Sequence, residues 1–185
     1  MFCRYGEKMK VVRYSTTAML LHWLIALLIF VLFPLGLYMH GLKLSPTKLH
    51  LYSYHKWAGI TVLLLAILRL AWRTTHRPPA LLMPRWQQTA SSAVHALLYL
   101  LIIAVPLSGW LMSSAKGVQT VWFGILSLPD LVAKDKALGH LLGSVHQILN
   151  YTLLVLVTLH IAAALKHRFI DRDDVLARML PGKNS

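Results

Sequence analysis

The chain has 185 residues, of which 57% are hydrophobic and 14% are charged, and its formal net charge is +13. A water-soluble domain of this size rarely combines so little charge with so much apolar sequence, and the mean hydropathy is positive. A basic balance can indicate nucleic-acid binding, but this sequence has no soluble domain that could present a basic face. We therefore expect an integral membrane protein and no nucleic-acid partner. Its cations would set its orientation and attract anionic lipid headgroups.

Four apolar runs are long enough to cross a hydrocarbon core about 30 Å thick as helices. They cover about 18–39, 52–72, 93–112 and 145–165. The runs predict an all-α membrane protein, with one domain over 1–185 that forms an antiparallel bundle of four transmembrane helices.

Lysines and arginines between the spans predict the orientation. Thirteen of the 19 lie in the N-terminal segment, in the second connection with its flanks, and in the C-terminal tail. The positive-inside rule therefore places both termini in the cytoplasm. The longest connection, on the outer side, contains the apolar stretch Val121–Val132, which is too short to span. We expect it to lie at the membrane surface or to cap the bundle, and the tail after His167 to form a short amphipathic helix.

Histidine spacing is the most informative pattern in the chain. His146 and His160 are fourteen residues apart, so in a helix they lie within about 40° of one face and roughly 21 Å apart along the axis. His22 is near the inner end of the first span and His55 is near the outer end of the second. Matching depths pairs His22 with His160 and His55 with His146. Two axial imidazoles saturate a haem iron, so the pattern predicts two non-covalent haems at two depths. The alternative is histidines that hydrogen-bond between helices.

Three more residues near the inner ends of the spans are candidates for the same region. His95, in the third span, lies at about the depth of His22 and His160. It could be an axial ligand, contact a haem propionate or line a quinone pocket. Arg69 and Arg73, one turn apart in the second span, could bind the propionates of an inner haem. Alternatively, they mark the edge of the membrane.

The outer region contains candidates with weaker signals. Gly59 and Gly143 lie within a turn of outer histidines, where a missing side chain would admit a porphyrin face or allow close helix packing. His50 precedes His55 by five residues and could approach the edge of an outer haem. The remaining histidines are expected to be solvated or interfacial: His40, His76, His140 and His167.

Several other chemistries are disfavoured. The sequence has no H-E-x-x-H motif and no acidic residue in any span, which argues against a metallohydrolase and against an ion-coupled transporter. Cys3 is the only cysteine, so no intrachain disulfide can form, and no C-x-x-C-H motif attaches a haem covalently.

Short motifs in chain order resemble the bacterial cytochrome b561 family. They are R-Y-S…H-W at 13–23, H-K at 55–56, L-R-L-A-W-R at 68–73, H-A-L-L-Y-L-L-I-I-A-V-P-L-S-G at 95–109, and the stretch from 146 through H-I-A-A-A-L-K-H-R-F-I-D-R-D-D at 160–174. The resemblance covers nearly the whole chain from Arg13 to Met179. It implies a four-helix membrane cytochrome of the bacterial inner membrane with two b-type haems. Their ligands would be the matching histidines, His22, His55, His146 and His160.

The family resemblance also implies a function. Members pass electrons between the periplasm and the quinone pool. The short, stand-alone type resembles superoxide oxidase, which oxidises periplasmic superoxide and reduces ubiquinone, whereas longer members anchor hydrogenase or formate dehydrogenase. We expect the stand-alone type, since the chain lacks the extra length of the anchors. The alternative is a cytochrome b subunit that passes electrons between a periplasmic oxidoreductase and the quinone pool.

Charge on the outer face fits an anionic substrate. Six lysines lie there against Asp130 and Asp135, and a cationic surface raises the encounter rate of a small anion such as superoxide. Lys56 is next to His55 in sequence. We predict Lys56 and His50 as residues on the substrate side of the outer haem. The alternative is a weakly basic loop with no role in substrate binding.

Overall fold

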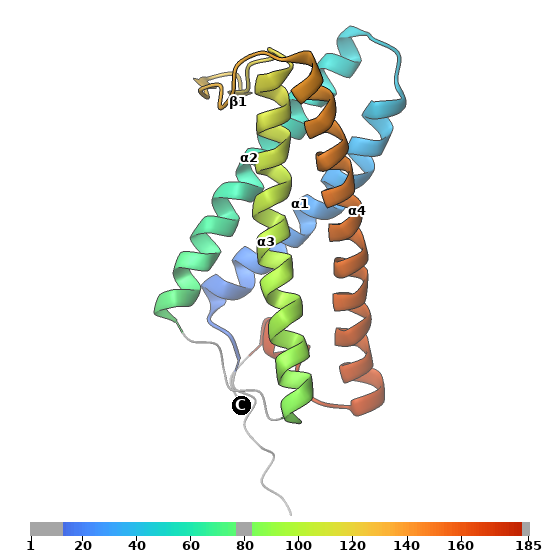
Figure 1. Cartoon of the computed structure of the whole chain (residues 1–185). Coiled ribbons are helices and arrows are strands. Elements are labelled where there is room, and N and C mark those ends of the chain that lie inside the picture. The colour runs from blue at the N-terminus through green and yellow to red at the C-terminus, as the bar shows by residue number, and fades with distance from the viewer. Residues whose placement is uncertain (1–12, 77–82, 183–185) are drawn as a thin grey trace, which may run out of the picture.

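The computed structural model describes residues 13–76 and 83–182, so Cys3 lies outside the described residues. Four long helices dominate it, and all four are long and apolar enough to cross a membrane. They are α1 (Thr16–Gly41), α2 (Pro46–Thr75), α3 (Arg85–Ala115) and α4 (Lys136–Lys166). Figure 1 shows them as an up-and-down bundle, which confirms the predicted fold. Each helix is longer than its predicted apolar run, because the first and last turns extend into polar sequence.

Three of the helices begin at side chains that accept a hydrogen bond from an orphan backbone N–H group. Ser15 caps α1 by accepting from Ala18, and Ser45 caps α2 by accepting from Lys48. Asp135 does the same for α4, where its carboxylate accepts from Leu138 at 3.0 Å. Such caps satisfy N–H groups that the helix itself leaves unpaired.

Helices that follow one another in sequence pack side by side: α1 on α2, α2 on α3 and α3 on α4. The centre of the bundle is a cluster of buried apolar side chains, Ala66 of α2, Leu101 and Ile102 of α3, and Leu153 of α4. This apolar layer separates the two ends of the bundle. Most other apolar side chains of the spans point outward, as expected of a surface that faces lipid.

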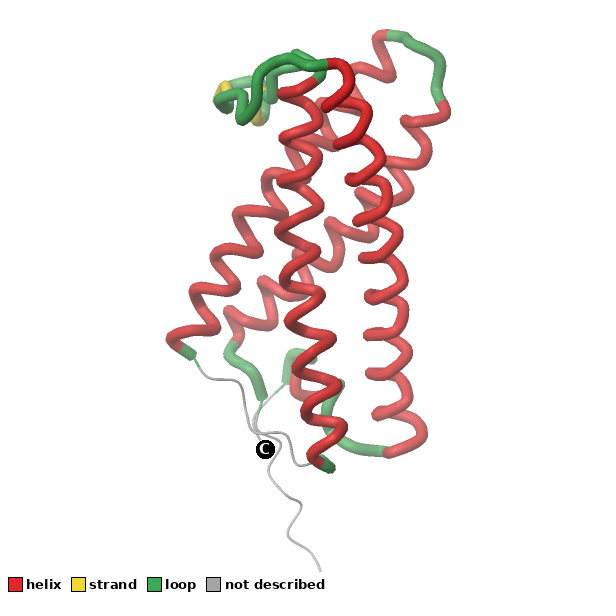
Figure 2. Tube along the Cα trace, viewed as in Figure 1, coloured by secondary structure: helices red, strands yellow, loops and turns green. Residues whose placement is uncertain are grey.

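Both ends of the described chain lie at the same end of the bundle, where the Tyr14 N–H donates to the carbonyl of Arg178 at 3.1 Å. We call this the inner end, after the orientation predicted by the positive-inside rule, and the opposite end the outer end. The inner end is at the bottom of Figure 2.

The prediction of an amphipathic helix in the tail is wrong. After α4 the chain makes a π-helical turn (His167–Asp171), reverses at Arg172 with φ of 55°, and adds only a 3-10 turn (Ala177–Met179). The helix ends because the chain reverses at Arg172, where the Asp173 N–H donates to the His167 carbonyl at 3.0 Å. Arg13 and Trp23 then hold the tail through the carbonyls of Ala177, Met179 and Leu180.

The apolar stretch in the outer connection lies at the outer end of the bundle, against α2. It forms a short antiparallel hairpin of β1 (Val121–Trp122) and β2 (Leu126–Ser127). Two indoles fasten the hairpin to α2. The Trp57 Nε1–H group donates to the Val121 carbonyl at 2.6 Å, and the Trp122 Nε1–H group donates to the Trp57 carbonyl at 3.2 Å.

Candidate functional site

Burial separates the ten histidines into two groups. Five are half-buried in the helices of the bundle: His22, His55, His95, His146 and His160. Four are exposed, at the helix ends or in connections: His40, His50, His76 and His140. The tenth, His167, is half-buried in the turn after α4. The first group contains all five histidines that were predicted to hold a cofactor.

At the inner end, three of these imidazoles from three helices meet. The ring centroids of His22 on α1 and His160 on α4 are 6.3 Å apart, and those of His95 on α3 and His160 are 5.3 Å apart. The His95 Nδ1 atom is 2.7 Å from the Ser91 carbonyl. Because a carbonyl only accepts, Nδ1 carries the proton and Nε2 is left without one.

This inner cluster fits a metal held between two imidazoles. A ring nitrogen binds a first-row metal at about 2 Å, so two imidazoles on opposite sides of one metal have centroids roughly 6 Å apart. The separation of His22 and His160 has this value, whereas His95 and His160 are about 1 Å closer. The geometry therefore favours His22 and His160 as the pair that could hold an inner haem, with His95 beside them.

Two arginines and a tyrosine border the inner cluster. Arg69 on α2 donates from Nε to the Tyr99 hydroxyl at 3.0 Å and from a terminal nitrogen to the Ala18 carbonyl at 2.6 Å. The guanidinium of Arg73 lies 5.7 Å from the centre of the Tyr99 ring. Ala18 and Tyr99 are each one turn from a histidine of the cluster. Arg69 therefore joins three helices at this level, and its charge is available there to a bound carboxylate such as a haem propionate.

At the outer end, His146 on α4 is held against α3. Its Nδ1 atom is 3.1 Å from the Val105 carbonyl and 2.9 Å from the Ser108 hydroxyl, whose own proton goes to the same carbonyl. Nδ1 must therefore be the protonated nitrogen, and Nε2 is free to bind a metal. Metal-binding histidines commonly have their second nitrogen fixed in this way by a backbone carbonyl.

Glycines of neighbouring helices lie against both outer histidines. A Cβ atom at Gly36 on α1 would lie 3.3 Å from Cε1 of His55, and one at Gly109 on α3 would lie 3.1 Å from Cε1 of His146. The Nδ1 atom of His55 is buried and has no hydrogen-bond partner in the described structure. An unsatisfied buried nitrogen and two glycines at which a side chain would press on an imidazole fit a site built to place two imidazoles.

The glycines that the sequence singled out have different surroundings. A Cβ at Gly59 would meet nothing within 4 Å, and one at Gly143 would lie 3.6 Å from the Met112 sulfur. Gly36 and Gly109, which contact the outer histidines, were not among the predicted residues. The sequence does contain a pattern that could have indicated them, because every helix of the bundle has a pair of site residues fourteen positions apart. These pairs are His22 and Gly36, His55 and Arg69, His95 and Gly109, and His146 and His160.

Neither predicted residue on the substrate side makes a hydrogen bond to an outer histidine in the described structure. The Lys56 ammonium donates to the Val118 carbonyl at 3.2 Å and so fastens the outer connection. His50 is exposed, and five residues place it about 140° around α2 from His55. Their proposed roles stay predictions, with Lys56 already engaged by a backbone carbonyl.

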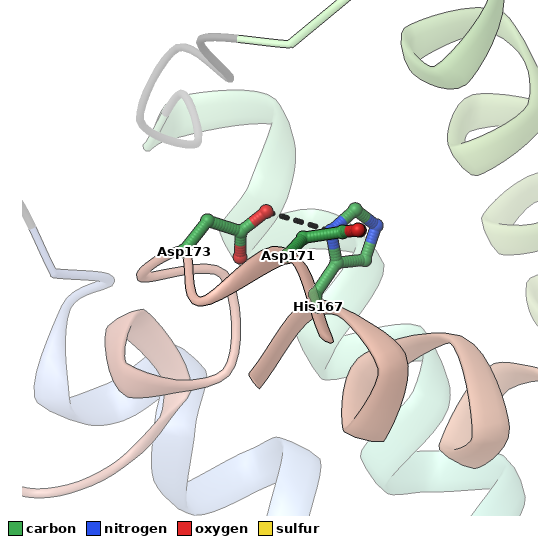
Figure 3. A group of neighbouring side chains, drawn as sticks. All are labelled: His167, Asp171 and Asp173. Atoms are coloured by element: carbon green, nitrogen blue, oxygen red, sulfur yellow. Dashed lines mark hydrogen bonds and ion pairs between the residues drawn. The ribbon is translucent and has the colours of Figure 1, made fainter. Parts of the chain in front are cut away.

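His167 forms an ion-pair network just beyond α4, seven residues after His160. Its Nδ1 atom is 2.7 Å from Asp173 Oδ2 and 3.2 Å from Asp171 Oδ2 (Figure 3). The Lys166 ammonium lies 2.6 Å from the same Asp171 oxygen. The ligand atoms of His167, Asp171 and Asp173 are close enough together to hold a metal ion. The Lys166 ammonium already supplies a positive charge to these carboxylates. The network fixes the turn that redirects the chain toward α1.

Comparisons with known proteins show what the whole chain is similar to. The family model described as prokaryotic cytochrome b561 matches residues 13–182. "Cytochrome b561 homolog 2" of Escherichia coli (strain K12) is 37% identical over 176 residues, which is 94% of this chain and 93% of that protein. "Cytochrome b561 homolog 1" of the same organism is 30% identical and covers 91% and 97% of the two chains. "Probable superoxide oxidase CybB" of Yersinia pestis is 27% identical and covers 92% and 97%.

Proposed function

Because this chain belongs to the prokaryotic cytochrome b561 family, a family of multi-pass inner-membrane proteins, we propose that it oxidises superoxide at its outer end and reduces ubiquinone at its inner end. The overall reaction takes one electron from each of two superoxide anions and gives both electrons, with two protons, to one quinone. The products are two molecules of dioxygen and one quinol.

The observation that supports this proposal best is the arrangement of half-buried histidines at two levels of one bundle. A b-type haem with two axial imidazoles supplies one-electron transfer. We assign His55 and His146 to the outer haem and His22 and His160 to the inner one. The apolar layer around Ala66 lies between the two levels.

The remaining polar residues of the inner end have separate parts in this proposal. Arg69 and Arg73 supply positive charge for the propionates of the inner haem, and a nearby cation also favours the reduced state. We place the quinone beside His95, because Nε2 of this histidine can take up a proton at the inner end and donate it to an oxygen of the reduced quinone.

The superoxide substrate is supported by the Yersinia relative, which is named for that activity. A second function also has a structural observation in its favour. The tip of the outer hairpin is apolar and open, with Phe123 53% and Ile125 88% exposed. Such a surface suits a periplasmic oxidoreductase that donates electrons by docking there. In that case the chain would be the cytochrome b subunit of a larger enzyme.

One experiment separates these functions. The chain is purified alone in detergent, its haem content is measured as the pyridine haemochrome, and its spectrum is followed after mixing with superoxide. Two b haems per chain, reduced by superoxide and reoxidised by added ubiquinone, support the proposed reaction. Two haems per chain that are not reduced by superoxide support a protein as the electron donor. A colourless chain contradicts both functions.

A further inference from the structure

The side chain of Lys116 lies along two glycines of α4. Lys116 directly follows α3, at the outer end of the bundle. A Cβ atom at Gly139 would lie 3.0 Å from Cγ of Lys116, and one at Gly143 would lie 3.9 Å from its Nζ atom. The lysine stem therefore passes over Gly139, and the ammonium group reaches Gly143. A larger residue at position 139 would obstruct this path.

The direction of this side chain brings its charge toward an outer histidine. Gly139, Gly143 and His146 are spaced i, i+4 and i+7 on α4, so they share one face of the helix. The Lys116 ammonium is consequently about one turn beyond His146, on the side that faces the outer surface. The lysine is exposed to solvent, so an anion arriving from water can meet it.

The Lys116 ammonium makes no hydrogen bond to the rest of the described chain, unlike two other lysines near the outer end. Lys56 donates to the Val118 carbonyl and Lys48 donates to the Leu42 carbonyl. Across residues 13–76 and 83–182, the only carboxylates that pair with a cation are in the tail beyond α4. Lys116 therefore has no carboxylate partner among the described residues.

From this geometry we infer that Lys116 binds an oxyanion at the outer histidine pair. The ligand is a carboxylate or a small anion, either the propionate of a bound outer haem or a diffusing anion such as superoxide. The inference rests on the proposed function. It assigns to Lys116 the electrostatic role that the sequence pattern suggested for Lys56. A cation at this position raises the local concentration of an anionic substrate and stabilises the reduced state of a nearby redox centre.

The test replaces the charge at Lys116 and at a matched exposed lysine on the same side. We compare Lys116→Gln with Lys136→Gln, measuring the rate of reduction by superoxide at several ionic strengths and the midpoint potential of each haem. Lys116→Gln should slow reduction by about threefold or more at low salt and flatten its salt dependence, or lower the potential of the outer haem. Lys136→Gln should do neither. The cationic donor hexaammineruthenium(II) should reduce Lys116→Gln no more slowly than the wild type.

A glycine variant tests the geometry without removing the charge. Gly139→Ala adds a methyl group 3.0 Å from the lysine stem, so it should displace the ammonium and reproduce the effect of Lys116→Gln. Combining the two changes should add nothing further. Gly41→Ala is the control, because a Cβ there meets nothing within 4 Å. Haem content equal to that of the wild type shows that each variant is folded.

The two sources of the anion give different results. A change in salt dependence identifies a diffusing anion, and a lower potential of the outer haem with unchanged salt dependence identifies the propionate. A wild-type chain with two haems, combined with a Lys116→Gln variant that changes neither quantity, overturns this inference and leaves the proposed function standing. A wild-type chain without haem overturns both.

Discussion

His146 lies so close to Gly109 that a Cβ atom at position 109 would be 3.1 Å from its Cε1 atom and 3.4 Å from its Nδ1 atom. Few real Cβ atoms make contacts this short, and the imidazole has little freedom to move away. Its Nδ1–H group is held by the Val105 carbonyl and the Ser108 hydroxyl on the same side. A side chain at position 109 would therefore press directly on this imidazole.

Gly109→Ala should displace His146 and weaken the outer haem selectively. The added methyl group forces the imidazole off its hydrogen bonds, so the bond from the opposite nitrogen to iron would be misdirected. We expect haem content to fall from about two to about one per chain, or the outer haem to change its reduced spectrum. Gly41→Ala, at the end of α1 where a Cβ meets nothing within 4 Å, is the control and should keep both haems.

Single histidine substitutions should separate the two haems. His55→Ala or His146→Ala should remove the outer haem and leave most of the inner one, since the apolar layer around Leu101 and Leu153 lies between the levels. Redox titration with the pyridine haemochrome assay measures this. His50→Ala, which changes an exposed histidine of α2, should leave both haems. Two haems in either ligand variant would disprove the assigned pair.

His95 and His22 compete for the same role, and their variants should differ. If His22 and His160 are the inner ligands, His22→Ala should lose the inner haem, whereas His95→Ala should keep it and reduce quinone more slowly. The centroid separations of 6.3 Å and 5.3 Å favour this result. Retention of both haems in His22→Ala, with loss in His95→Ala, would reverse the assignment.

The two depths at which the histidines lie in the bundle could be predicted from the sequence, because they depend on the helical period alone. Fourteen residues return a helix nearly to the same face, so the spacing of His146 and His160 was enough to place two sites at two depths. The same spacing relates His22 to Gly36 and His95 to Gly109. It did not indicate a site there, because glycine has no side chain that could bind a ligand. The four spans were predictable from length and hydropathy for a similar reason.

The contacts that the sequence could not show join residues far apart in the chain. Lys56 was singled out because it is next to His55, and its bond to the Val118 carbonyl, 62 residues away, could not be predicted from that position. The tail looked helical because its local pattern is amphipathic, yet its carbonyls bond to Arg13, more than 160 residues away. In both cases the contact is a tertiary hydrogen bond, and local pattern contains no information about it.

Arg13 should be required to keep the tail against α1. Its guanidinium donates to the Ala177 carbonyl at 2.8 Å and to the Leu180 carbonyl at 2.6 Å, while the Trp23 indole donates to Met179 at 2.8 Å. Trp23 is adjacent to His22, and the tail continues from the helix that carries His160. The tail therefore ties together the two helices that would hold the inner haem.

Arg13→Ala should release the tail and destabilise the inner end by about 1 kcal/mol, the usual net contribution of a hydrogen bond that is partly exposed to water. Trypsin should then cut after Arg178 faster than in the wild type, as measured by mass spectrometry. The inner haem should also be lost at a lower temperature, whereas the outer haem should not change. Arg168→Ala removes an exposed arginine beyond α4 and should leave both quantities as they are. Equal cleavage rates in Arg13→Ala and the wild type would show that the tail is held without Arg13.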